Sequence, residues 1–171
     1  MPPGGEGREL LAARLCQADT EGLRLVLARV LRDDDRARDL VQDALAAALA
    51  ASASYDPARP VEPWLYQIAF NRLRNLRRRA DVERRGLERK VHDAPYTPDP
   101  ARLAEQREDE SRLGLAVEDL PERQRLAVLL RYQEGMSCLA IAEALDTTPN
   151  AVSLLLFKAR RKLREALEGA A

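Results

Sequence analysis

Apolar residues recur every three or four positions along most of this 171-residue chain. One such stripe runs from Leu23 to Leu31, and a second runs from Ala37 to Leu49. This spacing puts the apolar side chains on one face of an amphipathic helix, and no segment shows the two-residue alternation of a strand. An aromatic content of only 4% also disfavours a β-sandwich or barrel. The sequence therefore predicts an all-α protein.

Helix-starting and helix-breaking residues divide this pattern. Residues 33–35, all Asp, have the character of an N-cap and an acidic first turn for the second stripe. Two prolines make residues 55–60 a loop, and Pro63 begins a helix that continues to Arg79. On the buried side of that helix we expect Leu65, Ala69, Leu73 and Leu76.

The apolar period is lost where three prolines fall between residues 95 and 100. Such a composition is typical of an extended, exposed linker. Helical spacing returns with Leu103, Leu113, Val117 and Leu120. We therefore predict two small helical domains, residues 8–84 and 106–171, joined by a flexible linker over residues 85–105.

The last two predicted helices have helix-turn-helix spacing. A short helix from Ser137 to Leu145 follows a helix that begins at Pro121 and is capped by Gly135, and a longer basic helix runs from Asn150 towards Glu168. Ordinary helical hairpins share this spacing, so a plain hairpin stays open as an alternative. In a DNA-binding unit the second helix enters the major groove, and its outer residues contact bases and phosphates. The candidates are Asn150, Ser153, Leu154, Lys158, Arg160 and Arg161, with Lys162 and Arg164 as further phosphate contacts.

A net charge of zero conceals alternating blocks of charge. Residues 64–92 contain 9 basic and 3 acidic side chains, and residues 150–171 contain 5 basic and 2 acidic ones. Residues 1–63 and 93–149 are acidic instead. Two separate basic segments indicate two contacts with polyanions on different parts of the chain. The alternative is that the arginine-rich helices are simply solvated.

The first basic segment is the helix from Trp64 to Arg79. One face of it combines an aromatic ring, two amides and two arginines: Trp64, Gln67, Asn71, Arg74 and Arg78. Rings stack on unpaired bases, amides contact base edges and arginines hold phosphates, so this combination is typical of single-stranded DNA binding. The alternative for Trp64 is an ordinary core position.

The second apolar stripe has an acidic edge. Asp39, Gln42 and Asp43 fall on the polar side of that helix. A cluster of this kind suits the docking of a basic partner, because complementary charge guides association. The alternative is a solvated helix face with no partner.

Several kinds of chemistry lack the residues they need. The two cysteines, Cys16 and Cys138, are far apart, and the one histidine, His92, falls in the predicted linker. We find no phosphate-binding glycine loop, nucleophile–base pair or metal-ligand cluster, so we predict neither an enzyme nor a bound metal or cofactor. The chain also lacks a signal peptide and an apolar run long enough to span a bilayer, so we expect a cytoplasmic protein without direct membrane contact.

Two sets of motifs resemble those of a known family. Residues 39–45 (DLVQDAL) and 63–73 (PWLYQIAFNRL) resemble region 2 of bacterial RNA polymerase sigma factors. Residues 120–125 (LPERQR), 135–145 and 158–164 (KARRKLR) resemble region 4 of the same family. The resemblance covers about residues 20–168, in family order, and the short two-domain organisation is similar to the extracytoplasmic-function (ECF) group.

This resemblance implies a transcription initiation factor, the promoter-specificity subunit that binds core RNA polymerase and helps to melt the promoter. Region 2 would dock on the clamp helices of the β′ subunit through Asp39, Leu40, Gln42 and Asp43. Region 4 would contact the β flap and read the −35 element as duplex. Many family members are held inactive by an anti-sigma factor, so the resemblance implies such a partner here.

The resemblance also implies how region 2 binds the −10 element. The loop from about residue 54 to residue 62 and the following basic helix would capture flipped bases of the non-template strand. The implied contacts are Trp64, Gln67, Asn71, Arg74, Asn75, Arg77 and Arg78.

The chain departs from the family pattern in three places. Asn75 stands where the family commonly has Asp, which leaves that helix more basic, and Leu139 and Ala140 replace a usual Glu pair. In the last helix, Leu154 and Leu155 replace residues that hydrogen-bond to bases, although leucines would pack on thymine methyl groups. Readout of the −35 element is then weak, shape-based or shifted to Asn150 and Ser153.

Two other functions compete with this one. A stand-alone helix-turn-helix regulator would bind duplex DNA without polymerase. A helical interaction protein would sequester a partner and bind no DNA. The helix that begins at Trp64 discriminates between them, because a regulator that reads only duplex gains nothing from a ring beside Asn71 and Arg74.

Overall fold

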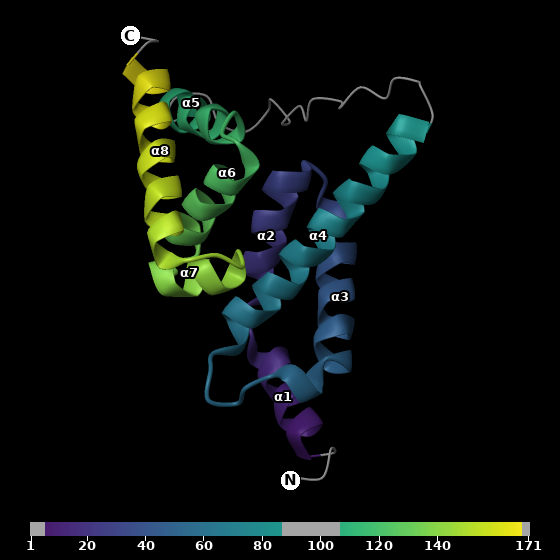
Figure 1. Cartoon of the computed structure of the whole chain (residues 1–171). Helices are drawn as coiled ribbons and strands as arrows, with labels where there is room; N and C mark the ends of the chain where they lie inside the picture. The colour runs from purple at the N-terminus through teal and green to yellow at the C-terminus, as the bar shows by residue number, and fades with distance from the viewer. Residues whose placement is uncertain (1–5, 87–106, 169–171) are drawn as a thin grey trace.

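The computed structural model describes residues 6–86 and 107–168, which form two helical domains (Figure 1). The first domain contains α1 (Glu6–Gln17), α2 (Thr20–Leu31), α3 (Asp34–Ala50), a short 3-10 turn η1 (Ser52–Ser54) and α4 (Val61–Gly86). The second contains α5 (Arg107–Glu118), α6 (Glu122–Val128), a π-helical turn η2 (Leu129–Gln133), α7 (Cys138–Ala144) and α8 (Pro149–Glu168). No strand occurs within these ranges, so the predicted all-α class is confirmed. Residues 87–105 of the predicted linker lie outside the described residues.

Capping residues set the helix ends as the sequence predicts. At the start of α3 the Asp33 carboxylate accepts a hydrogen bond from the Arg36 backbone N–H at 3.0 Å. At the start of α7 the Ser137 hydroxyl accepts one from the Ala140 N–H at 3.1 Å. Gly135 has a φ of 65°, the left-handed conformation that ends a helix most readily at glycine. The π-helical turn before Gly135 was not predicted from the apolar pattern.

The predicted apolar stripes form the core of the first domain. Helix α2 packs on α3, and α3 packs on α4. Leu23, Val26 and Leu27 of α2 are fully buried, and so are Ala44 and Ala48 of α3. The core also includes α1, where Leu11 and Leu15 are buried four residues apart. The four-residue spacing of these two leucines is the sequence signal for α1, which lies before the two apolar stripes that begin at Leu23.

Two leucines of the predicted helical pattern are exposed, and one of them, Leu76, was expected to be buried. Leu76 is 50% exposed, because the buried face of α4 ends at Leu73 while the helix continues past its neighbours (Figure 1). Leu113 is 44% exposed, because α5 buries Val117 and the following Leu120 instead. The periodic pattern identified the helices correctly, but it did not show where their neighbours end.

The two domains pack against each other in what we call the closed arrangement. Helix α4 lies against α7, and α2 contacts α6 and η2 (Figure 1). Buried residues of both domains belong to one apolar cluster. The sequence predicted two domains but gave no sign of this contact, since residues far apart in the chain supply its two sides.

Candidate nucleic-acid interfaces

The helix-turn-helix of the second domain is formed by α7 and α8. The turn between them uses Asp146, which has a φ of 50°, and the Thr148 hydroxyl accepts a hydrogen bond from the Ala151 N–H at 3.2 Å. Helix α8 buries Val152, Leu156 and Ala159 against the rest of the domain. Because one face of α8 is fixed in the core, the opposite face is held outward, as a recognition helix requires.

All six predicted contacts on α8 are exposed: Asn150, Ser153, Leu154, Lys158, Arg160 and Arg161. Three of them also bond within the helix. The Ser153 hydroxyl donates to the Pro149 carbonyl at 3.1 Å, the Arg160 guanidinium donates to the Leu156 carbonyl at 3.3 Å, and Arg161 lies 3.6 Å from Glu165. Leu155, which sequence analysis grouped with Leu154, is half-buried and packs on the core. Only the first of these two leucines is therefore presented to a ligand.

The basic face of α4 changes character along its length. Trp64, Gln67 and Asn71 are half-buried near the start of the helix, and the later Arg74, Asn75 and Arg78 are exposed. The Trp64 ring lies 5.0 Å from the Tyr55 ring, tilted by 42°. Trp64 thus packs against the edge of the core and keeps part of its ring accessible. This position is intermediate between the two alternatives predicted from sequence, an exposed ring that stacks on an unpaired base and an ordinary core residue.

The loop before α4 is fixed by residues that sequence analysis missed. Tyr55 is buried, and its hydroxyl donates to the Arg59 carbonyl at 2.9 Å. Arg14, from α1, donates to the Tyr55 hydroxyl and to the Pro57 carbonyl, each at 2.8 Å. Because Tyr55 also supports the Trp64 ring, these contacts couple the position of the loop to the aromatic face of α4.

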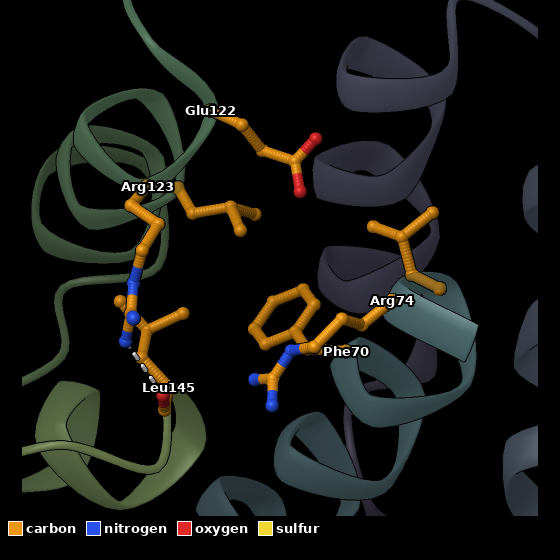
Figure 2. Close-up of a pocket in the computed structure, with 7 residues that line it drawn as sticks. Phe70, Arg74, Glu122, Arg123 and Leu145 are labelled. Atoms are coloured by element: carbon orange, nitrogen blue, oxygen red, sulfur yellow. Dashed lines mark hydrogen bonds between the residues drawn. The ribbon is translucent and has the colours of Figure 1, made fainter. Parts of the chain in front are cut away.

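The second domain occupies part of the α4 face. Arg77 forms an ion pair with Glu122 of α6 and donates to the Val30 carbonyl at 3.3 Å. A cavity of about 60 Å³ lies between α4 and the second domain, and Figure 2 shows Phe70 and Arg74 facing Arg123 across it. Two of the predicted DNA contacts, Arg74 and Arg77, therefore lie at the domain interface in the closed arrangement.

A partly buried hydrogen bond lies further along this interface. The Tyr66 hydroxyl of α4 donates to the Glu134 carboxylate at 2.9 Å. Burial, and then the nearby Glu134 charge, raise the pKa of Tyr66 far above its ordinary value, so its hydroxyl remains a donor at neutral pH. Gly22 of α2 leaves room for this contact, since a Cβ there would overlap the Glu134 carboxylate. Sequence analysis singled out none of these three residues.

The acidic edge of α3 lies on the molecular surface. Asp39, Gln42 and Asp43 are exposed, as a docking surface requires. Leu40, which the resemblance placed among the polymerase contacts, is only 2% exposed and belongs to the core beneath. This corrects the expectation for Leu40, which lies on the buried side of α3 and not on its exposed acidic edge.

Within the described residues, no group of three or more His, Cys, Asp or Glu is arranged to hold a metal ion. None of the described helices is both long enough and apolar enough to cross a membrane.

A helix-turn-helix beside a second, separate basic helix defines a helical protein of the DNA-binding class. Comparison with known families identifies two regions. Residues 21–82 match Sigma-70 region 2, and residues 111–163 match Sigma-70 region 4. These ranges correspond to the two helical domains in the structure.

Individual relatives agree with this assignment. The chain is 32% identical over 134 residues to RNA polymerase sigma factor NccH of Alcaligenes xylosoxydans xylosoxydans, which covers 76% of this chain and 72% of the relative. It is 25% identical to ECF RNA polymerase sigma factor SigD of Mycobacterium tuberculosis, over 99% of this chain and 88% of the relative. The chain therefore belongs to the ECF group of RNA polymerase sigma factors, and it is a promoter-specificity transcription initiation factor.

Solved structures show the same fold. One is the sigma factor RpoE in complex with the anti-sigma factor NepR from Bartonella quintana, with a TM-score of 0.69, 23% identity, and coverage of 92% of this chain and 94% of that one. Another is CnrH in complex with the cytosolic domain of CnrY, with a TM-score of 0.59, 24% identity, and coverage of 96% and 98%.

Proposed function

We propose that the two domains divide promoter recognition between two states of DNA. Helix α8 binds the −35 element as duplex, and α4 with the loop over residues 54–62 binds the opened non-template strand of the −10 element. The observation that carries this proposal is the pair of basic faces on two different domains. The face on α4 includes a half-buried ring beside amides and arginines, and the face on α8 is the outward side of a recognition helix.

Docking on core polymerase would use the acidic edge of α3. Asp39, Gln42 and Asp43 are exposed together on one side of this helix, above a core that includes Leu40. Complementary charge supports binding to a basic partner surface, which we assign to the β′ clamp helices. The second domain would contact the β flap. In this assembly the catalysis belongs to the polymerase core, and this chain would supply promoter contacts only. The assembly would form in the cytoplasm, where polymerase acts.

The closed arrangement suggests that the free protein must open before it engages a promoter. Arg77 is paired with Glu122 and Arg74 faces the second domain, so both contacts change when α4 binds a DNA strand. We propose an anti-sigma factor as a further partner, because one structural relative was solved in complex with the anti-sigma factor NepR and the other in complex with a cytosolic protein domain. Such a partner would stabilise a form in which α4 is unavailable.

The proposal is tested by reconstitution with core RNA polymerase on a genomic promoter library. We expect specific transcripts that disappear when the full-length variant Asp39→Arg/Asp43→Arg replaces the wild type. A matched control is Asp35→Arg, because Asp35 is an exposed acid on the same helix but in its first turn. No specific transcript with the wild-type protein would contradict the function, and equal loss with both variants would contradict the docking surface.

A stand-alone regulator is not favoured by the family assignment. It remains distinguishable by gel shift, because it would bind specific duplex DNA tightly without polymerase. A sequestering protein would show no DNA binding in either assay. We expect high-affinity, specific binding only in the presence of core polymerase.

A further inference from the structure

An unusual stripe runs along the outward face of α8. Asn150, Leu154, Phe157 and Arg161 are spaced by four, three and four residues, so they form one line along the helix. This line lies opposite the buried Val152, Leu156 and Ala159. Leu154 is 52% exposed and Phe157 is 59% exposed, so its middle two members are large apolar side chains in contact with solvent.

The stripe is not part of the core of its own domain. The chain buries apolar residues at the other positions of this segment, since Val152 is fully buried, Leu156 is 5% exposed and Leu155 is half-buried. Leu154 and Phe157 are left outside by the geometry of the helix. An apolar pair with more than half of each side chain exposed to solvent points to contact with a ligand.

The polar groups on this face offer little base readout. The Ser153 hydroxyl already donates to the Pro149 carbonyl, and Arg161 is paired with Glu165 in the last turns. Asn150, in the first turn of α8, is the one amide on the stripe. Leu154 and Phe157 follow it by about 6 and 10 Å along the helix axis, within reach of a groove about 12 Å wide.

Charge indicates what covers the stripe. Exposed basic residues lie on both sides of it and beyond it, namely Lys158, Arg160, Lys162 and Arg164. Duplex DNA fits this arrangement, because phosphates on the two groove walls meet the basic residues while the stripe faces the base edges. Within the major groove, thymine alone among the four bases presents a methyl group.

We infer that Leu154 and Phe157 read thymine methyl groups in the −35 element. This inference rests on the proposed function and extends it to the chemistry of recognition: −35 specificity comes from apolar contacts, with Asn150 supplying a hydrogen-bonded reference point. An apolar partner protein and a second copy of the chain are the competing occupants of the stripe.

The test begins with holoenzyme, reconstituted from the full chain and core polymerase. A selection from random duplexes gives the −35 sequence, and we expect it to include thymine on at least one strand. Each thymine is then replaced by deoxyuridine, which removes the 5-methyl group and keeps the base pair. We expect about a fourfold loss of holoenzyme affinity at each methyl that is read, the size expected for one buried methyl group.

Protein variants show whether the stripe is responsible. Leu154→Ala and Phe157→Ala are expected to weaken holoenzyme binding to the thymine duplex. Each variant holoenzyme is then expected to bind the thymine duplex and the deoxyuridine duplex with almost equal affinity. Leu154→Met, which keeps an apolar side chain, is expected to keep the preference for thymine. Leu167→Ala is the matched control, because Leu167 is an exposed leucine near the other end of α8, about 20 Å along the axis from Leu154. Circular dichroism confirms that each variant is folded.

The outcomes separate this inference from the function beneath it. Failure of the selection to yield any specific −35 sequence overturns the proposed function and the inference together. A specific −35 sequence that lacks thymine, or one whose recognition is unchanged by deoxyuridine, overturns the inference alone. Stripe variants that lose affinity equally on both duplexes overturn it as well. Alanine variants of the stripe that retain the thymine preference also overturn it. If they abolish self-association in sedimentation, the stripe binds a second copy of the chain, and if they abolish binding of a co-purified protein, it binds an apolar partner protein.

Discussion

The two basic helices of this protein, α4 and α8, present their DNA-binding faces differently. On α8, all six predicted contacts are exposed and the helix is held by its buried side alone. On α4, Arg77 is paired with Glu122, and Arg74 faces the second domain across a small cavity (Figure 2). The proposed duplex-reading face is therefore exposed in the closed arrangement, whereas two residues of the proposed strand-binding face lie at the domain interface.

The largest expected effect separates the two sides of α8. Leu156→Ala, which truncates a side chain only 5% exposed, is expected to lower the free energy of unfolding by about 2–5 kcal/mol. Leu154→Ala, on the exposed side, is expected to change it by no more than about 0.5 kcal/mol. Urea denaturation followed by circular dichroism measures both. A comparable loss from Leu154→Ala would mean that the stripe is structural.

A second prediction concerns the ring on α4. Trp64→Ala is expected to reduce promoter opening by roughly 5- to 150-fold, the equivalent of 1–3 kcal/mol for base stacking, with little effect on the closed complex. Permanganate reactivity of unpaired thymines reports opening, and filter binding at low temperature reports the closed complex. Leu76→Ala is the control, because Leu76 is an exposed apolar residue on the same helix. Equal losses in both assays would contradict the role of Trp64 in strand capture.

A third prediction tests phosphate contact by α8. Arg161→Ala is expected to weaken binding of holoenzyme to all −35 sequences alike and to reduce the salt slope by about one. When the salt concentration is raised tenfold, the factor by which the DNA affinity of the variant holoenzyme falls is then roughly eightfold smaller than the factor for the wild type. Arg36→Ala is a suitable control, because Arg36 has a side chain 77% exposed and lies on α3. A change confined to one −35 sequence would instead indicate base readout by Arg161.

The smallest expected effect concerns the closed arrangement. Tyr66→Phe removes the donor to Glu134 and is expected to weaken domain closure by about 0.5–1.5 kcal/mol, or two- to tenfold. Spin labels on the natural Cys16 and Cys138, which lie in different domains, would report a larger population of long distances. Tyr132→Phe removes the same hydroxyl from an exposed side chain and is expected to have no effect. An unchanged distance distribution in Tyr66→Phe would show that this hydrogen bond does not hold the domains together.

Local signals predicted much of the fold because they act over a few residues. Apolar spacing placed the helices, and Asp33, Ser137 and Gly135 marked helix ends by interactions with their nearest neighbours. The same logic placed the candidate contacts on outward faces of α4 and α8. It failed for Leu76, because burial depends on which other helix lies alongside, and spacing alone does not state where that helix ends. For Leu40 the apolar spacing was right, and the family resemblance, which made this residue a polymerase contact, was not.

The amino-acid sequence by itself determined the helical class, the two domains, the family motifs and the pair of basic helices. Each of these is encoded in residues close together in the chain. The tertiary structure alone decided that Arg14 and Tyr55 fix the loop beside Trp64, that Tyr66 donates to Glu134 beside Gly22, and that only one of two adjacent leucines on α8 faces outward. These features join residues separated by tens of positions, or depend on the exact rotation of a packed helix, and only the folded chain brings such groups into contact.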